Sequence, residues 1–142
     1  MRWLTTVAFV TAAGLPDPLR DAERPGVRVI PVRLACCAVE LDAAESAGLL
    51  VPEAPEHGPA TATVVVVAGT VTGALAGAIE AAMEPGASVV AFGACASTGG
   101  PYWDAPSVVN GADTRIPVTE YVPGCPPRPT DLIRAVLEAV PA

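Results

Sequence analysis

The sequence predicts an α/β fold with a mainly parallel sheet, and three observations lead to that prediction. Residues 63–68 are an unbroken run rich in β-branched side chains, as expected for a parallel strand buried on both faces. A helical segment and an apolar run at residues 88–92 follow, so residues 63–92 form one βαβ unit with a right-handed crossover. Cys95 and Cys125 each come just after an expected strand, and open α/β sheets bind ligands at the carboxyl ends of strands.

The first half of the chain adds an extended segment, a helix and a loop. Residues 27–34 read as extended and lead directly to the first cysteines. Residues 38–50 have a helical composition, with Glu40 in the first turn, where an acidic side chain complements the helix dipole. Three prolines and a glycine in residues 51–60 predict a loop. The only histidine, His57, lies there and is expected to be a solvated residue and not a metal ligand.

The second half of the chain completes the sheet and ends in a helix. Thr70 is placed to cap the helix after residues 63–68, and Pro85 with Gly86 ends that helix. Residues 114–122 approach a further strand, and Pro129 suits the start of a C-terminal helix with one apolar face. Because the chain is long enough for one core and shows no repeat, residues 1–142 are expected to form one domain.

Composition and charge argue against two classes of partner. The net charge is −7 and there is no lysine, whereas nucleic-acid binders need a basic face. No apolar run reaches the roughly 18 residues of a membrane span. Residues 3–13 read as a first strand or, less favoured, as a short signal peptide.

The four cysteines carry most of the functional information. Cys36 and Cys37 are adjacent, Cys95 lies in a glycine-rich segment, and Cys125 lies between glycine and proline. Four thiolates are the usual ligand set of a 4Fe-4S cluster. Neighbouring residues point in different directions, so Cys36 and Cys37 could bind one centre only from a bent loop. A redox cluster is the leading interpretation.

Three other uses of four cysteines remain open on the residues alone. Structural zinc sites take ligands from closely spaced cysteine pairs with two to four residues between them, and this chain has no such pair. Disulfides would allow three pairings, of which a bond between adjacent cysteines closes a strained ring. The simplest alternative is four buried free thiols, because cysteine is among the most buried residue types.

Four motifs resemble the B subunit of bacterial NADH:quinone oxidoreductase, which is respiratory complex I. They are Leu-Ala-Cys-Cys-Ala-Val-Glu at residues 34–40, Val-Ala-Gly-Thr-Val-Thr at 67–72, the glycine-rich segment at 93–100, and Tyr-Val-Pro-Gly-Cys-Pro-Pro-Arg-Pro at 121–129. The motifs match in order from about residue 34 onward. The small subunits of nickel–iron hydrogenases share the fold but have a spaced cysteine pair, so the doublet favours the quinone-reductase branch.

The resemblance implies a flavodoxin-like, three-layer fold and an electron-transfer role. It implies one 4Fe-4S cluster bound by Cys36, Cys37, Cys95 and Cys125, which passes electrons toward quinone at the junction with a larger subunit. The chain is then expected to act within an enzyme complex and not alone, in the cytoplasm on the inner face of the cell membrane. The alternative is a small subunit of a hydrogenase-type complex that delivers electrons to a partner other than quinone.

Three further residues are candidates for tuning the cluster. Glu40 resembles the acidic residue that follows the cysteine doublet in the family; it could hydrogen-bond near the cluster or take up a proton when the cluster is reduced. Arg33 and Arg128 lie near cluster ligands in sequence, where positive charge would favour the reduced cluster. Alternatively, both arginines are surface residues at an interface. The chain departs from the family at residues 53–61, a shortened segment without arginine.

Overall fold

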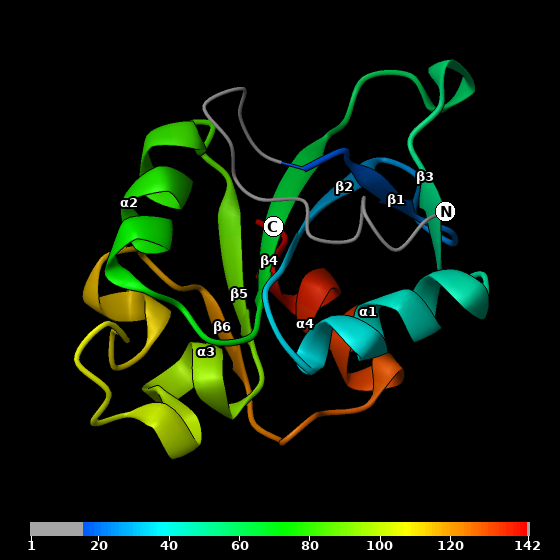
Figure 1. The fold of residues 1–142 in the computed structure, drawn as a ribbon. Helices are drawn as coiled ribbons and strands as arrows, with labels where there is room; N and C mark the ends of the chain where they lie inside the picture. Colours follow the sequence, from blue (N-terminus) through cyan, green and yellow to red (C-terminus); the bar gives the residue numbers. More distant parts are fainter. Residues whose placement is uncertain (1–15, 142) are drawn as a thin grey trace, which may run out of the picture.

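The computed structural model describes residues 16–141, and their strands form one six-stranded sheet with helices on both faces (Figure 1). The strand order is β3-β1-β2-β4-β5-β6. β2, β4, β5 and β6 are mutually parallel, and only β1 is antiparallel to its neighbours β2 and β3. The predicted mainly parallel sheet is therefore confirmed. The strands are β1 (Leu19–Asp21), β2 (Val27–Arg33), β3 (Leu50–Pro52), β4 (Ala62–Ala68), β5 (Ser88–Phe92) and β6 (Glu120–Val122).

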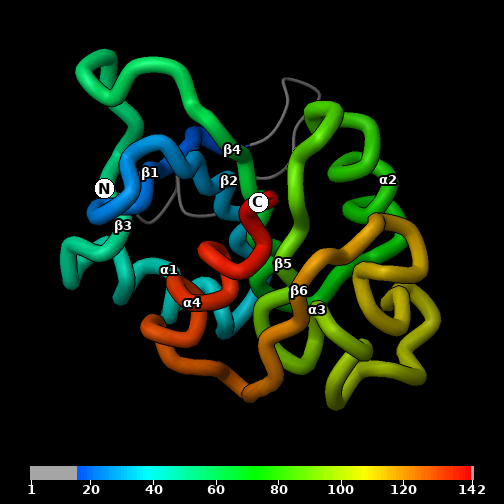
Figure 2. Tube along the Cα trace, turned by 180° about the vertical axis from the view of Figure 1, so that it is seen from behind, coloured from blue at the N-terminus to red at the C-terminus, as the bar shows by residue number. Residues whose placement is uncertain are grey.

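Two helices cover each face of the sheet, which gives the three layers that the resemblance implies. α1 (Cys37–Ser46) and α4 (Pro129–Ala139) pack on one face, while α2 (Gly73–Ala82) and α3 (Ala94–Thr98) pack on the other (Figures 1 and 2). A hydrophobic core lies on each face of the sheet, and the central strand β4 contributes side chains to both cores in alternation. Val64 and Val66 join the α1/α4 core, and Val65 and Val67 join the α2/α3 core. Burial on both faces explains the unbroken valine run.

Helix caps show one error in the sequence prediction. The cap of α2 is Thr72 and not Thr70, since the hydroxyl oxygen of Thr72 accepts a hydrogen bond from the backbone N–H of Leu75 at 3.3 Å. The first turn forms two residues later than expected because residues 69–72 cross from the sheet to the helix in a non-helical conformation. Pro129 begins α4 as predicted.

Short strands were the main elements that the sequence did not reveal. β1 was not predicted, and the helix expected to reach residue 50 ends at Ser46, which frees Leu50 to begin β3. The predicted loop at residues 51–60 therefore contains the end of a strand and a 3-10 turn, Pro55–His57. The ring nitrogen Nδ1 of His57 accepts a hydrogen bond from the backbone N–H of Ala54 at 2.9 Å, so this histidine closes a turn.

Two remaining expectations concern the membrane and the N-terminus. Among residues 16–141, no helix is both long enough and apolar enough to cross a membrane. The strand or signal peptide predicted for residues 3–13 lies outside the described residues.

Candidate metal centre

All four cysteines lie beyond the carboxyl ends of three parallel strands, at one edge of the sheet (Figure 1). Cys36 and Cys37 follow β2, Cys95 follows β5, and Cys125 follows β6. The four thiols are free, so the structure contains no disulfide between them. The sheet topology thus gathers at one edge cysteines that are up to 89 residues apart in sequence (125 − 36).

Cys37 has the most strongly perturbed thiol of the four. Its side chain is 2% exposed and belongs to the core beneath α1 and α4. Burial, followed by the charge and hydrogen bond of Cys36 and the charges of Cys95 and Cys125, raises the pKa of Cys37 to about 12. The other three cysteines are therefore close enough to Cys37 to act on its charge.

Four thiols are a donor set found in both zinc sites and 4Fe-4S clusters. Among residues 16–141, no group of three or more His, Cys, Asp or Glu side chains converges closely enough to hold one metal ion. A tetrahedral zinc ion binds its sulfur ligands at about 2.3 Å and draws all four together. In a 4Fe-4S cluster each thiolate binds a different iron, so the ligands stand farther apart. The four thiols therefore suit a 4Fe-4S cluster, and the chain lacks the cysteine pair with two to four residues between its members that is typical of structural zinc.

Glycines leave room beside two of the sulfur atoms. A Cβ atom on Gly93, whose φ is +98°, would overlap the Sγ atom of Cys37. A Cβ atom on Gly100, whose φ is +55°, would lie 3.0 Å from the Sγ atom of Cys95. At both positions the backbone conformation and the nearby sulfur require glycine. The glycine-rich segment seen in the sequence therefore provides space around the thiols.

Backbone hydrogen bonds join the cysteine loops to one another. The N–H of Gly93 donates to the carbonyl of Val122, and the N–H of Ala94 donates to the carbonyl of Gly124, both at 2.8 Å. These bonds join the start of α3, which carries Cys95, to the loop that carries Cys125. The segment that leads to Cys36 is bonded to β4: the N–H groups of Leu34 and Ala35 both donate to the carbonyl of Ala68 at the end of that strand.

The cysteine doublet forms the sharp corner between β2 and α1. Cys37 is the first residue of α1 and Cys36 is its N-cap residue, with φ −55° and ψ −30° and no hydrogen bond from its side chain to the helix end. Cys36 is exposed while Cys37 is buried, so the two thiols point to different surroundings. The doublet thus lies in a bent segment, and its binding of one centre stays a prediction.

The three candidate tuning residues have different surroundings. Glu40 lies half-buried in the first turn of α1, as predicted, and Arg128 is exposed. Arg33 is 14% exposed and its guanidinium is paired with two carboxylates of α1: Nε donates to Oδ1 of Asp42 at 3.1 Å, and Nη2 pairs with Oε1 of Glu45. Asp42 and Glu45 were not predicted from the sequence as partners of Arg33. Their signal was two acids three residues apart on one helix face, close after an arginine at a strand end.

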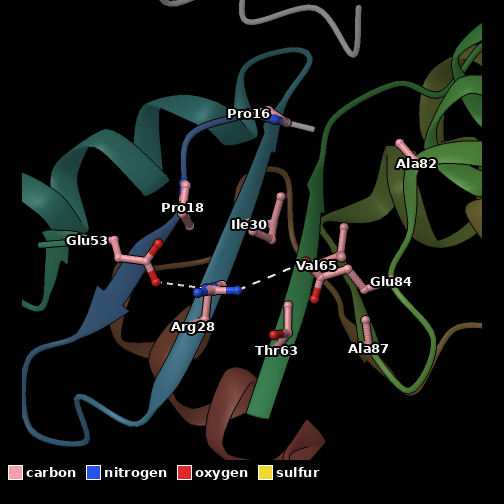
Figure 3. Close-up of a pocket in the computed structure, with 10 residues that line it drawn as sticks. All are labelled: Pro16, Pro18, Arg28, Ile30, Glu53, Thr63, Val65, Ala82, Glu84 and Ala87. Carbon is pink, nitrogen blue, oxygen red and sulfur yellow. Dashed lines mark hydrogen bonds and ion pairs between the residues drawn. The ribbon is translucent and has the colours of Figure 1, made fainter. Parts of the chain in front are cut away.

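A groove of about 270 Å³ lies at the other end of the sheet, near the amino ends of β2 and β4 (Figure 3). Nε of Arg28 donates to Oε1 of Glu53 at 2.8 Å, and Nη1 of Arg28 lies 4.0 Å from Oε1 of Glu84. Burial acts to raise the pKa of Glu53, but the hydrogen bonds and charges of Arg28 and Arg20 outweigh it, so that this pKa is lowered. Among the described residues, each charged side chain that lines the groove (Arg28, Glu53 and Glu84) has an ion-pair partner.

Large apolar side chains are exposed near the cysteines. Tyr102 and Trp103, in the turns that directly follow the Cys95 helix, are 55% and 62% exposed. Val39, in the first turn of α1, is 63% exposed. These three residues follow the carboxyl ends of β2 or β5 along the chain, as Cys36, Cys37 and Cys95 do.

Comparisons with known proteins place the chain among respiratory subunits. Residues 21–139 match the family model described as "NADH ubiquinone oxidoreductase, 20 Kd subunit". The chain is 42% identical over 136 residues to an NADH-quinone oxidoreductase B subunit of Streptomyces griseus, covering 87% of this chain and 57% of that relative. It is 43% identical over 138 residues to an NADH-quinone oxidoreductase B subunit of Salinispora tropica, covering 88% and 72%. The chain thus spans little more than half the length of the Streptomyces relative.

A solved structure has the same fold. It is the membrane-bound sulfane sulfur reductase, an archaeal respiratory membrane complex, in which one chain matches with a TM-score of 0.58 and 25% identity. The match covers 78% of this chain and 66% of that one.

Proposed function

Because this chain belongs to the family of the 20 kDa subunit of NADH ubiquinone oxidoreductase, we propose that it is an electron-transfer subunit. In this proposal Cys36, Cys37, Cys95 and Cys125 bind one 4Fe-4S cluster, which accepts and releases single electrons on the path toward quinone. The observation that carries the proposal is the set of four free thiols at one edge of the sheet, with glycine where a sulfur atom leaves no room for a side chain.

The protein's own contribution is to hold and shield the cluster. The buried Cys37 and Cys95 would fix its inner side, while the exposed Cys36 and Cys125 would bind its outer side. Glu40 and the exposed Arg128 are the nearby charges proposed to adjust its reduction potential. Metal binding displaces the thiol protons, so the proton that Cys37 holds without metal would leave when the site is loaded.

A partner subunit is proposed to cover the cysteine edge. Two of the four proposed ligands are exposed, and so are Val39, two residues after Cys37, and Tyr102 and Trp103, which follow the helix that carries Cys95. A partner at this edge would exclude water from the cluster and bring the next electron carrier within reach. We place the chain in a complex I-like assembly on the cytoplasmic face of the membrane, with quinone at the junction of the two subunits.

A second candidate is an electron carrier that serves an acceptor other than quinone, as in hydrogenase-type complexes. One observation favours it: the matching solved structure is described as a sulfane sulfur reductase. Reduction of a quinone analogue by the assembled complex would separate the two candidates.

Anaerobic reconstitution tests the cluster directly. The protein should take up about four irons and four sulfides per chain and give an EPR signal when reduced. Cys95→Ser should lose or alter that signal, while Ser46→Ala, an exposed change at the far end of α1, should keep it. One zinc per chain without sulfide, or an unchanged signal in Cys95→Ser, would contradict the proposal.

A further inference from the structure

We propose that Arg33, Asp42 and Glu45 form a clamp that fixes the corner carrying Cys36 and Cys37, and that Arg33 acts on the cluster through this geometry and not through its charge. The inference rests on the proposed cluster binding. Arg33 is then a positioning residue, and the clamp consists of these three side chains.

The clamp spans the corner from one side to the other. Arg33 is the last residue of β2, and Asp42 and Glu45 lie on the second and third turns of α1. The guanidinium binds Oδ1 of Asp42 through Nε and Oε1 of Glu45 through Nη2. Only three residues, 34–36, separate Arg33 from the first residue of the helix. The clamp therefore fixes both arms of the turn that presents the two cysteines.

On its other side the corner rests against β4. The N–H groups of Leu34 and Ala35 both donate to the carbonyl of Ala68, at 2.9 and 3.3 Å. Gly69 leaves the space for this contact, since a Cβ atom there would lie 2.5 Å from the backbone nitrogen of Ala35. These bonds involve residues 34 and 35, which precede α1. The clamp instead links α1 itself to the end of β2, through Asp42 and Glu45.

The charges within the clamp oppose an electrostatic role for Arg33. One guanidinium faces two carboxylates, so the clamp carries a net charge of −1 and not +1. A group that stabilised the reduced cluster by charge would not be paired with an excess of acid. Binding by two carboxylates of one helix instead holds the arginine in a single geometry, which is what orienting a ligand-bearing segment requires.

The two roles predict different results for the same two variants. A charge role predicts opposite shifts of the midpoint potential, whereas a positioning role predicts faster cluster loss in both. If Arg33 acts by charge, removing it lowers the midpoint potential, and removing the two carboxylates raises it. If the clamp positions the cysteines, Arg33→Met and the double variant Asp42→Asn/Glu45→Gln both speed loss of the cluster to an iron chelator. We expect both to lose the cluster about tenfold faster, the lower end of what losing an outer partner of a metal ligand costs. Both should also broaden the reduced EPR signal.

Two further variants serve as controls. Arg134→Met removes an exposed arginine that pairs with Asp131 on α4, and it should leave both the loss rate and the EPR signal unchanged. Arg33→Glu/Glu45→Arg reverses one pair without changing the total charge, and it should recover part of the retention lost in Arg33→Met. Thermal unfolding of each apo variant separates a general loss of stability from a change confined to the cluster.

The outcomes distinguish this inference from the proposed function. If the wild type takes up no cluster, the proposed function fails. If the wild type loads normally but Arg33→Met and the double variant retain the cluster equally well, only the clamp is overturned. Opposite shifts of midpoint potential with unchanged retention would likewise overturn it and assign Arg33 an electrostatic role. Faster loss with an unaltered EPR signal and a lowered apo unfolding temperature would reduce the clamp to a purely structural contact.

Discussion

The two ends of the sheet differ in their most buried polar group, an arginine with three partners at the amino end, and in the free thiols that only the carboxyl end carries. At the amino end, the side chain of Arg20 is 1% exposed and donates to Glu53, to the carbonyl of Pro25 and to the carbonyl of Gly58, each at 2.7 Å. At the carboxyl end, four thiols remain free, and two of them are exposed. Charge that is fully partnered holds a fold together, whereas thiols that form no disulfide are available to bind a metal centre. The difference separates a structural cluster from a candidate site.

The largest effect is expected from a substitution that fills space at the cysteine end. Gly93→Ala places a Cβ atom against the Sγ atom of Cys37 at a φ of +98°, so iron uptake after reconstitution should fall to a small fraction of the wild-type value. Gly73→Ala is the matched control, because no atom lies within 4 Å of the added Cβ atom. Normal iron uptake by a folded Gly93→Ala variant would show that this edge has more room than the structure gives it.

The next effect is expected at the amino end and should concern stability alone. Arg20→Met leaves the carboxylate of Glu53 with one arginine and two backbone carbonyls without donors, which should cost about 3–5 kcal/mol in the free energy of unfolding. Urea unfolding measures this value, and the exposed Arg134→Met should change it by less than about 1 kcal/mol. The folded fraction should bind iron normally. A loss of cluster binding in fully folded Arg20→Met would contradict the conclusion that the amino end of the sheet affects stability alone.

A smaller effect is expected in the pH dependence of stability. The pKa of Glu53 is lower in the folded protein than in the unfolded chain, so the unfolded state binds more protons in the interval between the two values. The stabilisation is therefore complete above the unfolded value of about 4.3 and is lost as the pH falls through the folded value. Urea unfolding between about pH 3 and pH 5 should show a flatter dependence in Glu53→Gln. An identical slope in both proteins would show that Glu53 does not contribute to it.

The smallest effect is expected at an exposed pair near the cysteine edge. The hydroxyl of Tyr121 donates to Oδ2 of Asp113 at 3.0 Å, and this hydrogen bond, with some burial and the charge of Asp113, raises the pKa of Tyr121. The chain has two tyrosines, so comparing ultraviolet titrations of the wild type and of Tyr121→Phe identifies the part of the signal that belongs to Tyr121. Asp113→Asn should move that titration to lower pH, and Tyr121→Phe should remove it. A single unchanged titration in Asp113→Asn would contradict the pairing.

The sequence predicted those parts of the fold that depend on local pattern. Residues 63–68 and 88–92 were identified as strands because both faces of β4 and β5 are buried, which gives unbroken apolar runs. β1 and β3 have three residues each, too few for a periodicity to appear, and their pairing joins segments about 30 residues apart. The position of Thr72 as the helix cap depends on where the chain turns off the sheet, which composition does not encode.

The same division applies to the candidate site. The sequence predicted the cysteines at one edge of the sheet because they follow expected strands. In a parallel sheet the carboxyl ends of these strands lie at the same edge. That they bind a cluster stays a prediction. The partners of Arg33 and Arg20 were not foreseen, because pairing depends on how α1 and the loop at residues 53–58 fold back onto the sheet. Long-range ion pairs carry almost no signal in a single sequence.

The unequal depth of the four cysteines also implies an order in time. Cys36 and Cys125 face outward, whereas Cys37 belongs to the hydrophobic core and Cys95 is buried beside Gly100. Under the proposed function, an iron–sulfur cluster delivered from outside would meet the two outer thiols first and reach the inner pair only as the core adjusts around Cys37. Maturation would then be a directional process, and a partner that docked on this edge too early would close the entrance before the cofactor had arrived.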